Sequence, residues 1–377
     1  MWSPQLYKQN GLKQGLSEKL LETAITHGNK PIYSSHNLPS ILSLKHLSCR
    51  TGINYKELRA FVNRSNHEAY KKFSIQKRSG GRRFISVPTP RLMHVQRWLN
   101  KYVFRQIPVH SASHAFTTGS SIKKCAARHC GAKWLIKLDI EDFFGSISEI
   151  QIFRLFKDLG YQPLVSFEMA RLCTFPTSWP SKRNLYKQWH VREKNKKIPE
   201  YNQKLLGYLP QGAATSPLIS NLIMKKCDEK LTHIAEKYKL TYTRYSDDLS
   251  FSSRSKNFCR LKAKKAIFEI YKILSEAGYR PQYRKTKIIP PSSKKIILGL
   301  NVDGAMPRLQ KECKDKIRQH LYYIEKLGID AHVSNRAFDS IWGFKCHLRG
   351  MIDYANMIEP DYAQESLQKF SKIDWPV

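Results

Sequence analysis

Two adjacent aspartates, Asp247 and Asp248, lie in the stretch YTRYSDDLSFS at residues 242–252. The aromatic and β-branched residues on both sides predict a strand, a tight turn and a second strand, with both carboxylates at the hairpin tip. Two such charges repel each other, and a divalent cation is an economical reason for their placement, because Mg²⁺ prefers carboxylate and phosphate oxygens. A bare Asp-Asp pair is more often a solvated turn, since aspartate favours turns. The remaining motifs must therefore decide between these two interpretations.

A third carboxylate, Asp139, lies in the stretch KWLIKLDIEDFF at residues 133–144. Apolar and mixed residues alternate here, which predicts a strand that ends in an acid, followed by a helix over residues 146–156. Binding sites are often built at the carboxyl end of a strand, although an isolated aspartate there is more often a helix cap.

Residues 207–226, GYLPQGAATSPLISNLIMKK, combine a turn rich in Gly and Pro with an apolar helix that starts at Ser216 or Pro217. Gln211 and Gly212 in this turn leave little bulk, so a substrate could lie against the backbone.

Two basic stretches could meet phosphate groups. Residues 73–88 predict a hairpin around Gly80-Gly81, and this hairpin carries Lys77, Arg78, Arg82 and Arg83. A second stretch, residues 176–205, interleaves cations with aromatic residues, a pattern that suits a nucleic-acid strand. Its candidate binding residues are Arg183, Lys187, Trp189, Arg192, Lys196 and Lys197. For each stretch, a solvated loop is an equally good interpretation.

The composition narrows the class of partner. The 377 residues carry a formal net charge of +35, which favours nucleic acid as a partner. A membrane is less favoured, because no apolar run has spanning length, and the N-terminus lacks the apolar core of a signal peptide. We therefore expect a cytoplasmic protein. The eight cysteines form no C-x-x-C pair and are expected to be reduced thiols, and His114 and His129 are interpreted as structural.

The sequence also predicts the helices and strands that must position these residues. Residues 1–70 read as a helical segment, and residues 89–107 as a packing helix. A strand pair is expected within residues 280–304, and two helices over residues 308–357, separated by a break near residues 328–335.

Taken in order, these motifs resemble a reverse transcriptase of the bacterial retron type, within the wider group that includes group II intron enzymes. LDIEDFF is similar to the first catalytic motif of that family, LPQGAATSP to the motif of the nucleotide pocket, YSDD to the Tyr-x-Asp-Asp signature and RKTK to the Lys-Thr motif. HAFTTGSSIKKCAARH resembles the retron-type segment ahead of the first catalytic strand. The chain departs from the retron pattern at Cys125, Gln282 and residues 297–299, where the family usually has Asn, Asn and Val-Thr-Gly.

The resemblance implies an α+β, right-hand polymerase fold with fingers, palm and thumb. After the helical segment 1–70, it implies fingers over residues 71–132 and a palm over residues 133–304, made of an antiparallel sheet plus helices with the basic-aromatic insertion near 176–205. A helical thumb would follow over residues 305–377.

The resemblance also implies roles for single residues. Asp139, Asp247 and Asp248 would hold two Mg²⁺ ions, with Mn²⁺ as an alternative, and Lys285 would donate a proton to the leaving pyrophosphate. The nucleotide-binding residues would be Lys77 and Arg83 on the triphosphate, Phe144 as the gate that excludes a ribose 2′-OH, and Gln211 in the pocket wall.

A retron enzyme implies a structured non-coding RNA that serves as template and primer, with priming from the 2′-OH of a guanosine. It also implies dNTP substrates, a branched RNA–DNA product, anti-phage defence with a separate effector protein, and no membrane. Two alternatives stay open. One is a defence-associated reverse transcriptase with protein-primed or untemplated synthesis, and the other is an RNA-binding scaffold whose catalysis is dispensable.

Overall fold

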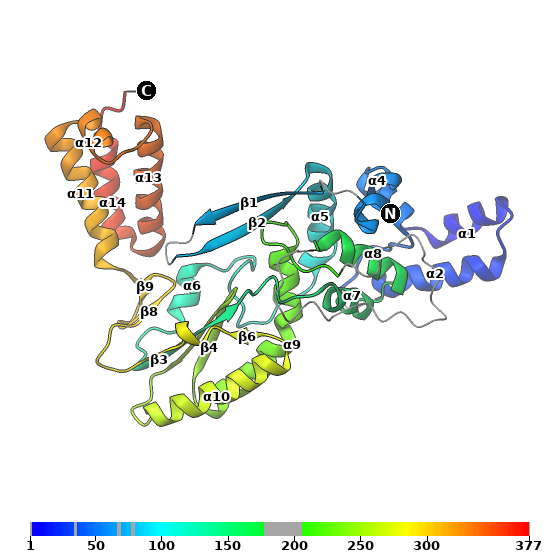
Figure 1. Ribbon diagram of the computed structural model, residues 1–377, viewed down its shortest axis with the longest axis horizontal. Coiled ribbons are helices and arrows are strands. Elements are labelled where there is room, and N and C mark those ends of the chain that lie inside the picture. The colour runs from blue at the N-terminus through cyan, green and yellow to red at the C-terminus, as the bar shows by residue number, and fades with distance from the viewer. Residues whose placement is uncertain (1, 34–35, 66–68, 77–79, 177–205, 377) are drawn as a thin grey trace. The chain divides into compact units, whose positions relative to one another are not determined.

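The computed structural model describes residues 2–33, 36–65, 69–76, 80–176 and 206–376 (Figure 1). The chain divides into two compact units. The first unit comprises Met1–Thr117, Ile140–Leu231 and Tyr271–Pro281. The second comprises Thr118–Asp139, Thr232–Ile270 and Gln282–Val377.

Helices form the N-terminal part of the first unit, as the sequence predicts. They are α1 (Pro4–Lys13), α2 (Glu18–Ile32), α3 (Leu44–Thr51) and α4 (Tyr55–Asn63). Side chains cap three of these helices. The hydroxyl of Ser3 accepts a hydrogen bond from the Leu6 N–H in α1, the hydroxyl of Ser43 accepts one from the His46 N–H in α3, and the Asn54 side chain accepts one from the Lys56 N–H in α4.

A two-stranded hairpin follows, and it confirms the prediction for residues 73–88. Strand β1 (Tyr70–Gln76) pairs antiparallel with β2 (Arg82–Pro88), and Gly80 and Gly81 both have positive φ in the turn. Helix α5 (Pro90–Tyr102) comes next and buries Leu92, Val95 and Leu99 on one face. A 3₁₀ turn, η1 (Phe104–Gln106), ends this part of the chain.

The middle of the first unit contains α7 (Glu149–Asp158), α8 (Pro163–Cys173) and most of α9 (Ser216–Lys237). In α8 the residues from Val165 to Cys173 are all buried, so this helix is part of the core. Tyr208 forms isolated β-bridges with Ser148 and with Phe175. These bridges bring together the chain segments on either side of residues 177–205.

The second unit contains an antiparallel sheet. Strand β5 (Asp248–Ser253) lies between β4 (Thr241–Tyr245) and β3 (Trp134–Glu141), and β7 (Lys287–Ile289) pairs with the other side of β3. The last two residues of β3 belong to the first unit and pair with β6 (Arg280–Pro281). The second unit also contains helix α6 (Ile122–Ala127), most of helix α10 (Arg260–Glu276) and the 3₁₀ turn η3 (Tyr283–Lys285).

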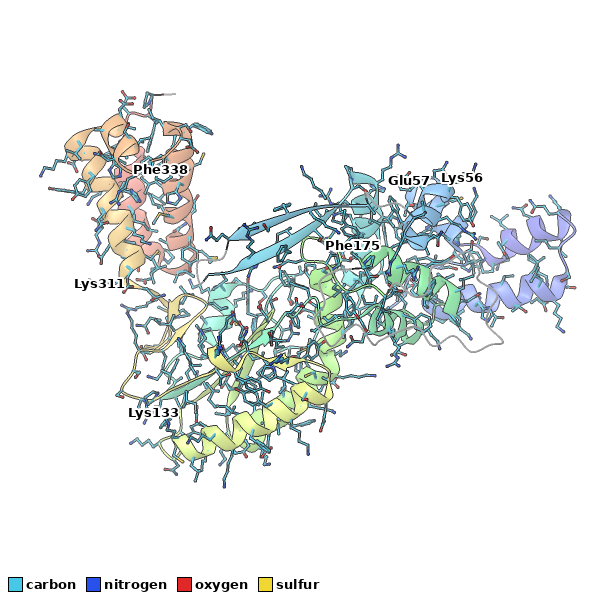
Figure 2. All side chains as sticks on the ribbon, viewed as in Figure 1. Lys56, Glu57, Lys133, Phe175, Lys311 and Phe338 are labelled. Atoms are coloured by element: carbon cyan, nitrogen blue, oxygen red, sulfur yellow. The ribbon has the colours of Figure 1, made fainter. Side chains whose placement is uncertain are left out.

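A small sheet and a helical bundle end the chain. The sheet contains β8 (Ile296–Ile297), β9 (Leu300–Asn301) and β10 (Arg308–Leu309). The helices are α11 (Lys311–Leu327), α12 (Ile329–Asn335), α13 (Ile341–Ile358) and α14 (Pro360–Ser371). Phe338, labelled in Figure 2, lies in this bundle. Its ring centroid is 5.0 Å from that of the fully buried Phe344. The two helices expected over residues 308–357 are present as α11 and α13, but the expectation of a plain break near residues 328–335 is wrong, because the short helix α12 lies there.

The fold is thus α+β with antiparallel sheets, as the sequence predicts for the class. All eight cysteines are free thiols. Within the described residues, no helix is long and apolar enough to cross a membrane.

Candidate catalytic site

Strand pairing brings the three acids together in the second unit. Asp139 of β3 is the register partner of Asp248 of β5. Tyr245 of β4 pairs with Asp248, so Ser246 and Asp247 are the two residues of the turn between the strands. The expectation that this strand ends at Asp139 is wrong by two residues: β3 continues to Glu141, because its last two residues pair with β6.

The turn that carries Asp247 is held in a strained conformation. Ser246 has φ of 60°, a left-handed value that non-glycine residues seldom adopt. Arg244, which is fully buried, donates a hydrogen bond from Nη1 to the Ser246 carbonyl oxygen at 3.2 Å. The Ser246 side chain lies close enough to the Asp247 carboxylate to offset slightly the rise in the pKa of Asp247. Sequence reasoning missed Arg244, although a charged residue in an otherwise buried strand next to the turn was a usable signal.

The three aspartate carboxylates form a cluster of negative charge that is only partly exposed to water. Burial, with the neighbouring Asp247 charge as the next cause, raises the pKa of Asp248 to about 6. Burial also raises the pKa of Asp247 above its usual value. The Lys285 Nζ lies 2.8 Å from the Asp139 Oδ2, and this hydrogen bond raises the pKa of Lys285. A cation near these acids would offset the cost of burying them.

The donor set fits a divalent cation such as Mg²⁺. It offers carboxylate oxygens only, and burial makes each added positive charge more favourable than it would be in water. As the side chains stand, no three His, Cys, Asp or Glu residues within the described ranges converge closely enough to hold an ion. The cation at Asp139 in this arrangement is the ammonium group of Lys285.

His129 supports the sheet that carries the acids. Its Nδ1 lies 2.7 Å from the Ser252 hydroxyl and its Nε2 lies 2.7 Å from the Thr243 hydroxyl, and the ring is fully buried. Cys125 donates to the same Thr243 hydroxyl at 3.4 Å. The interpretation of His129 as a structural histidine is therefore confirmed.

Three of the predicted nucleotide-binding residues lie in the first unit. Arg83 is exposed on β2, opposite Ile75 of β1. Phe144 is half-buried in the turn after β3 and packs against Phe143, with ring centroids 5.4 Å apart. Gln211 is half-buried in the loop before α9.

The Gln211 loop is fixed by its neighbours. The Ser86 N–H of β2 donates to the Gln211 carbonyl oxygen at 2.8 Å, and Asn100 of α5 donates from Nδ2 to the Ala214 carbonyl oxygen at 2.6 Å. Gly212 has φ of 119°, and a Cβ there would lie 2.9 Å from the Ser86 carbonyl oxygen. The absence of a side chain at Gly212 thus allows strand β2 to approach the loop closely. From the sequence, we expected a substrate to make this close approach.

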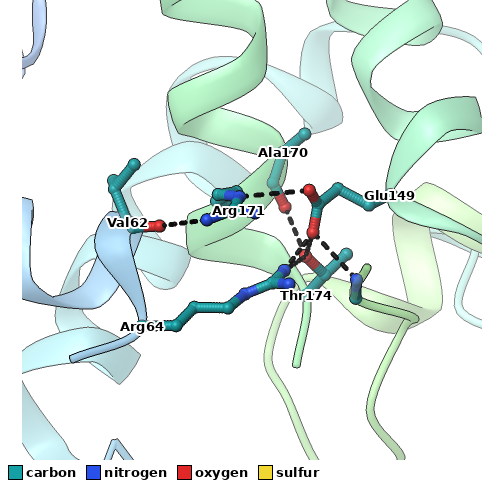
Figure 3. A network of polar contacts seen from close by, with 7 residues as sticks. Val62, Arg64, Glu149, Ala170, Arg171 and Thr174 are labelled. Carbon is teal, nitrogen blue, oxygen red and sulfur yellow. Dashed lines mark hydrogen bonds and ion pairs between the residues drawn. The ribbon is translucent and has the colours of Figure 1, made fainter. Parts of the chain in front are cut away.

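A buried ionic network, also missed by sequence reasoning, ties together both flanks of residues 177–205 (Figure 3). The fully buried Glu149 carboxylate accepts hydrogen bonds from Arg64, from the Arg171 Nε at 3.2 Å, from the Thr174 hydroxyl at 3.0 Å and from the Gly207 N–H at 3.0 Å. The only sequence signal was the capping box formed by Ser148 and Gln151, which places Glu149 at a helix start but does not reveal its partners.

Seven predicted residues lie outside the described residues. They are Lys77, Arg183, Lys187, Trp189, Arg192, Lys196 and Lys197.

Comparison with known proteins identifies the family. The reverse transcriptase (RNA-dependent DNA polymerase) family matches residues 75–302. The retron Ec73 reverse transcriptase of Escherichia coli is 31% identical over 330 residues, which cover 82% of this chain and 89% of that protein. The retron Mx65 reverse transcriptase of Myxococcus xanthus is 28% identical over 78% of this chain, which spans only 62% of that protein's length. A telomerase structure from Candida albicans aligns with a TM-score of 0.41 at 11% identity, over 79% of this chain and 55% of that one.

The match to the family extends over more than half of the chain and includes β3, the Gln211 loop and the hairpin of β4 and β5. The chain therefore belongs to the reverse transcriptase family of RNA-dependent DNA polymerases, within its retron branch.

Proposed function

We propose that this protein copies part of a structured non-coding RNA into DNA, with Asp139, Asp247 and Asp248 as its catalytic acids. The observation that carries the proposal is the register pairing of Asp139 with Asp248, with Asp247 in the adjoining turn. Such a cluster of half-buried carboxylates is costly to a fold and suits a site that must gather cations around a phosphoryl group.

The three carboxylates would hold two Mg²⁺ ions, and these ions would supply the positive charge that lowers the pKa of the attacking hydroxyl and neutralises the triphosphate. The protein itself contributes mainly positioning, as phosphoryl transfer requires. Arg244, through its hydrogen bond to the Ser246 carbonyl oxygen, would keep Asp247 at the hairpin tip. Lys285, whose ammonium group lies 2.8 Å from Asp139, would give its proton to the leaving pyrophosphate.

The nucleotide would be bound by residues of the first unit. Arg83, with Lys77 on the same hairpin, would contact the triphosphate, and Gln211 would line the pocket. Phe144 would exclude the 2′-OH of a ribonucleotide. In this proposal the chain forms a right hand, with fingers over residues 71–132, a palm over 133–304 and a thumb over 305–377.

The partner would be a non-coding RNA that supplies both template and primer, with synthesis starting at a guanosine 2′-OH and giving a branched RNA–DNA product. The net charge of +35 supports an RNA partner, because neutralised phosphates release counterions. The relatives named as retron reverse transcriptases support this choice. As a retron enzyme, the protein would act in cytoplasmic anti-phage defence with a separate effector protein.

The test is to sequence the nucleic acid that copurifies with the protein and to supply the complex with dNTPs and Mg²⁺. Wild-type protein should extend DNA on its RNA. Asp247→Asn should lower synthesis roughly 100-fold or more, the order of loss that follows removal of one preorganised electrostatic contact. RNA binding should be almost unchanged, because Asp247 carries no positive charge to lose.

A matched control is Asp353→Asn, because Asp353 is exposed on α13 and pairs only with its helical neighbour Arg349 among the interactions described. Synthesis by Asp247→Asn at the rate of this control would refute the assignment of the site. DNA without any RNA-templated sequence would refute the templated reaction.

A further inference from the structure

An exposed surface on helix α10 combines apolar and basic side chains. Leu261, Lys264, Lys265 and Phe268 occupy positions i, i+3, i+4 and i+7 of this helix, so they share one face. Leu261 is 63% exposed and Phe268 is 73% exposed, and both lysines are exposed. We call these four residues the α10 patch. All four belong to the second unit, and none has a role in the catalytic site described above.

The other face of α10 already supplies the packing that the fold requires. The residues of the helix that are buried in this unit are Ala263, Ala266, Ile267 and Ile270. Just before the helix, Phe258 packs against Trp134 of β3 with ring centroids 6.0 Å apart, which fixes the start of α10 on the sheet. A surface helix normally presents polar residues to solvent. Two large apolar side chains on one solvent face therefore indicate a contact with another molecule.

The cations of the α10 patch are available to a partner. Within the described ranges, neither Lys264 nor Lys265 forms an ion pair. Glu269, four residues after Lys265, is occupied, because it accepts hydrogen bonds from the Lys237 Nζ at 2.8 Å and from the Tyr238 hydroxyl at 2.7 Å. A partner with negative charge would complement the patch. A second copy of this chain would not, because it would set lysines against lysines, and such like-charge contacts are costly.

The spacing of the α10 patch fits an α-helix as the partner. In knobs-into-holes packing, four residues of one helix form the hole that receives a side chain of the facing helix. Leu261 and Phe268 would close the two ends of such a hole, about 10.5 Å apart along the helix axis. The alkyl stems of Lys264 and Lys265 would form its sides, with their ammonium groups at the rim. An apolar knob would fill this hole, and carboxylates beside the knob would meet the ammonium groups.

A strand of nucleic acid fits the α10 patch less well. Such a strand is bound by rings on which successive bases stack and by cations that meet phosphates. Phe268 offers one ring, but Leu261 offers none and would be left against water or phosphate. The pairing of a leucine with a phenylalanine two helical turns away therefore favours a protein partner.

We propose that the α10 patch docks an acidic amphipathic helix of another protein. One apolar side chain of that helix inserts between Leu261 and Phe268, and its carboxylates pair with Lys264 and Lys265. The inference goes beyond the proposed function and does not depend on it, because this contact needs neither template nor nucleotide.

The first test identifies the occupant. The full-length protein carries Phe268→p-benzoylphenylalanine, a photoreactive change that keeps an aromatic ring, in the cells that naturally contain it. Irradiation should label one protein, at a segment with apolar residues at i, i+3 or i+4 and i+7 and with Asp or Glu beside them. Labelling of RNA alone, of a second copy of this chain or of nothing would overturn the proposal.

A synthetic peptide of the labelled segment then tests the apolar contact with the purified full-length protein. Phe268→Ala should weaken peptide binding roughly tenfold or more, as the loss of an aromatic anchor at an interface does. Met306→Ala is the control, because Met306 is 67% exposed and lies outside the patch, and it should bind as the wild type does. Equal affinities of these two variants would overturn the proposal.

A charge swap tests the basic contact. The double variant Lys264→Glu/Lys265→Glu should bind the peptide about tenfold or more weakly, because like charges would face each other. It should bind a peptide whose acids are changed to lysine more tightly than the wild type does. The control Lys294→Glu/Lys372→Glu reverses two exposed lysines elsewhere in the second unit and should behave as the wild type.

Failure of the charge-reversed peptide to prefer the double variant would overturn the pairing of carboxylates with the patch. None of these assays involves DNA synthesis. A failure of the proposed function is therefore seen separately, as an inactive wild type that still binds the peptide.

Discussion

Replacing Glu149 with alanine should destabilise the first unit far more than the loss of an exposed ion pair. The carboxylate is fully buried, and the Arg64 and Arg171 side chains that donate to it are 5% and 0% exposed. The substitution leaves these guanidinium groups in place without the Glu149 carboxylate. Removing one partner of a buried ion pair costs about 3–5 kcal/mol, because the remaining charge is still desolvated.

Thermal unfolding measures this loss. A unit of this size shifts its midpoint by about 2–4 °C per kcal/mol, so Glu149→Ala should lower the first transition by roughly 6–20 °C. Asp353→Ala serves as the control, because its ion pair with Arg349 has both side chains 53% exposed and should contribute too little to resolve. A shift for Glu149→Ala no larger than that of the control would refute the reasoning.

A double-mutant cycle separates the ion pair from a general packing defect. Arg171→Met and Glu149→Ala are measured singly and together. The double variant should be less destabilised than the sum of the single variants, by 1 kcal/mol or more, because it no longer buries the Arg171 charge without Glu149. Additive effects would show that these side chains are not energetically coupled.

Three further predictions concern other parts of the chain. Gly212→Ala should raise the KM for dNTP, because its Cβ would lie 2.9 Å from the Ser86 carbonyl oxygen, whereas Gly278→Ala, with similar positive φ but open space, should not. Phe144→Ala should increase incorporation of rNTPs relative to dNTPs in a competition assay, and an unchanged ratio would remove the gate role. Burial lowers the pKa of His320 to about 4, so stability is complete above about pH 6.5 and falls by at most about 1.4 kcal/mol per pH unit between about 6.5 and 4. Unfolding midpoints across this range should show that slope, and His320→Gln should reduce it.

Local patterns predicted most of the elements that carry the site. The strand alternation in residues 133–144 and 242–252 placed side chains on the correct faces, because strand side chains alternate with a period of two. The Gly-Gly turn of β1 and β2 was also recognisable, since few residues other than glycine accept its positive φ. The order of these motifs along the chain was enough to predict the family.

Other features depended on partners distant in the sequence. Arg64 reaches Glu149 across 85 positions, and Lys285 reaches Asp139 across 146. No periodicity encodes such a contact, because it arises only when separate elements pack. The short helix α12 after Gly328 was missed for a different reason: a glycine breaks a helix but does not say whether another begins.

By itself, the sequence determined that three acids, a Gln-Gly turn and a following lysine occur in the order of a reverse transcriptase, because residue type and local spacing are written directly in the chain. Only the tertiary structure decided which of these residues lie next to one another. Register pairing of β3 with β5 sets Asp139 opposite Asp248, and pairing of β3 with β7 sets Lys137 opposite Lys287. Both pairings follow from hydrogen bonds between strands far apart in sequence, which fix the neighbours of a side chain more strongly than its own local sequence does.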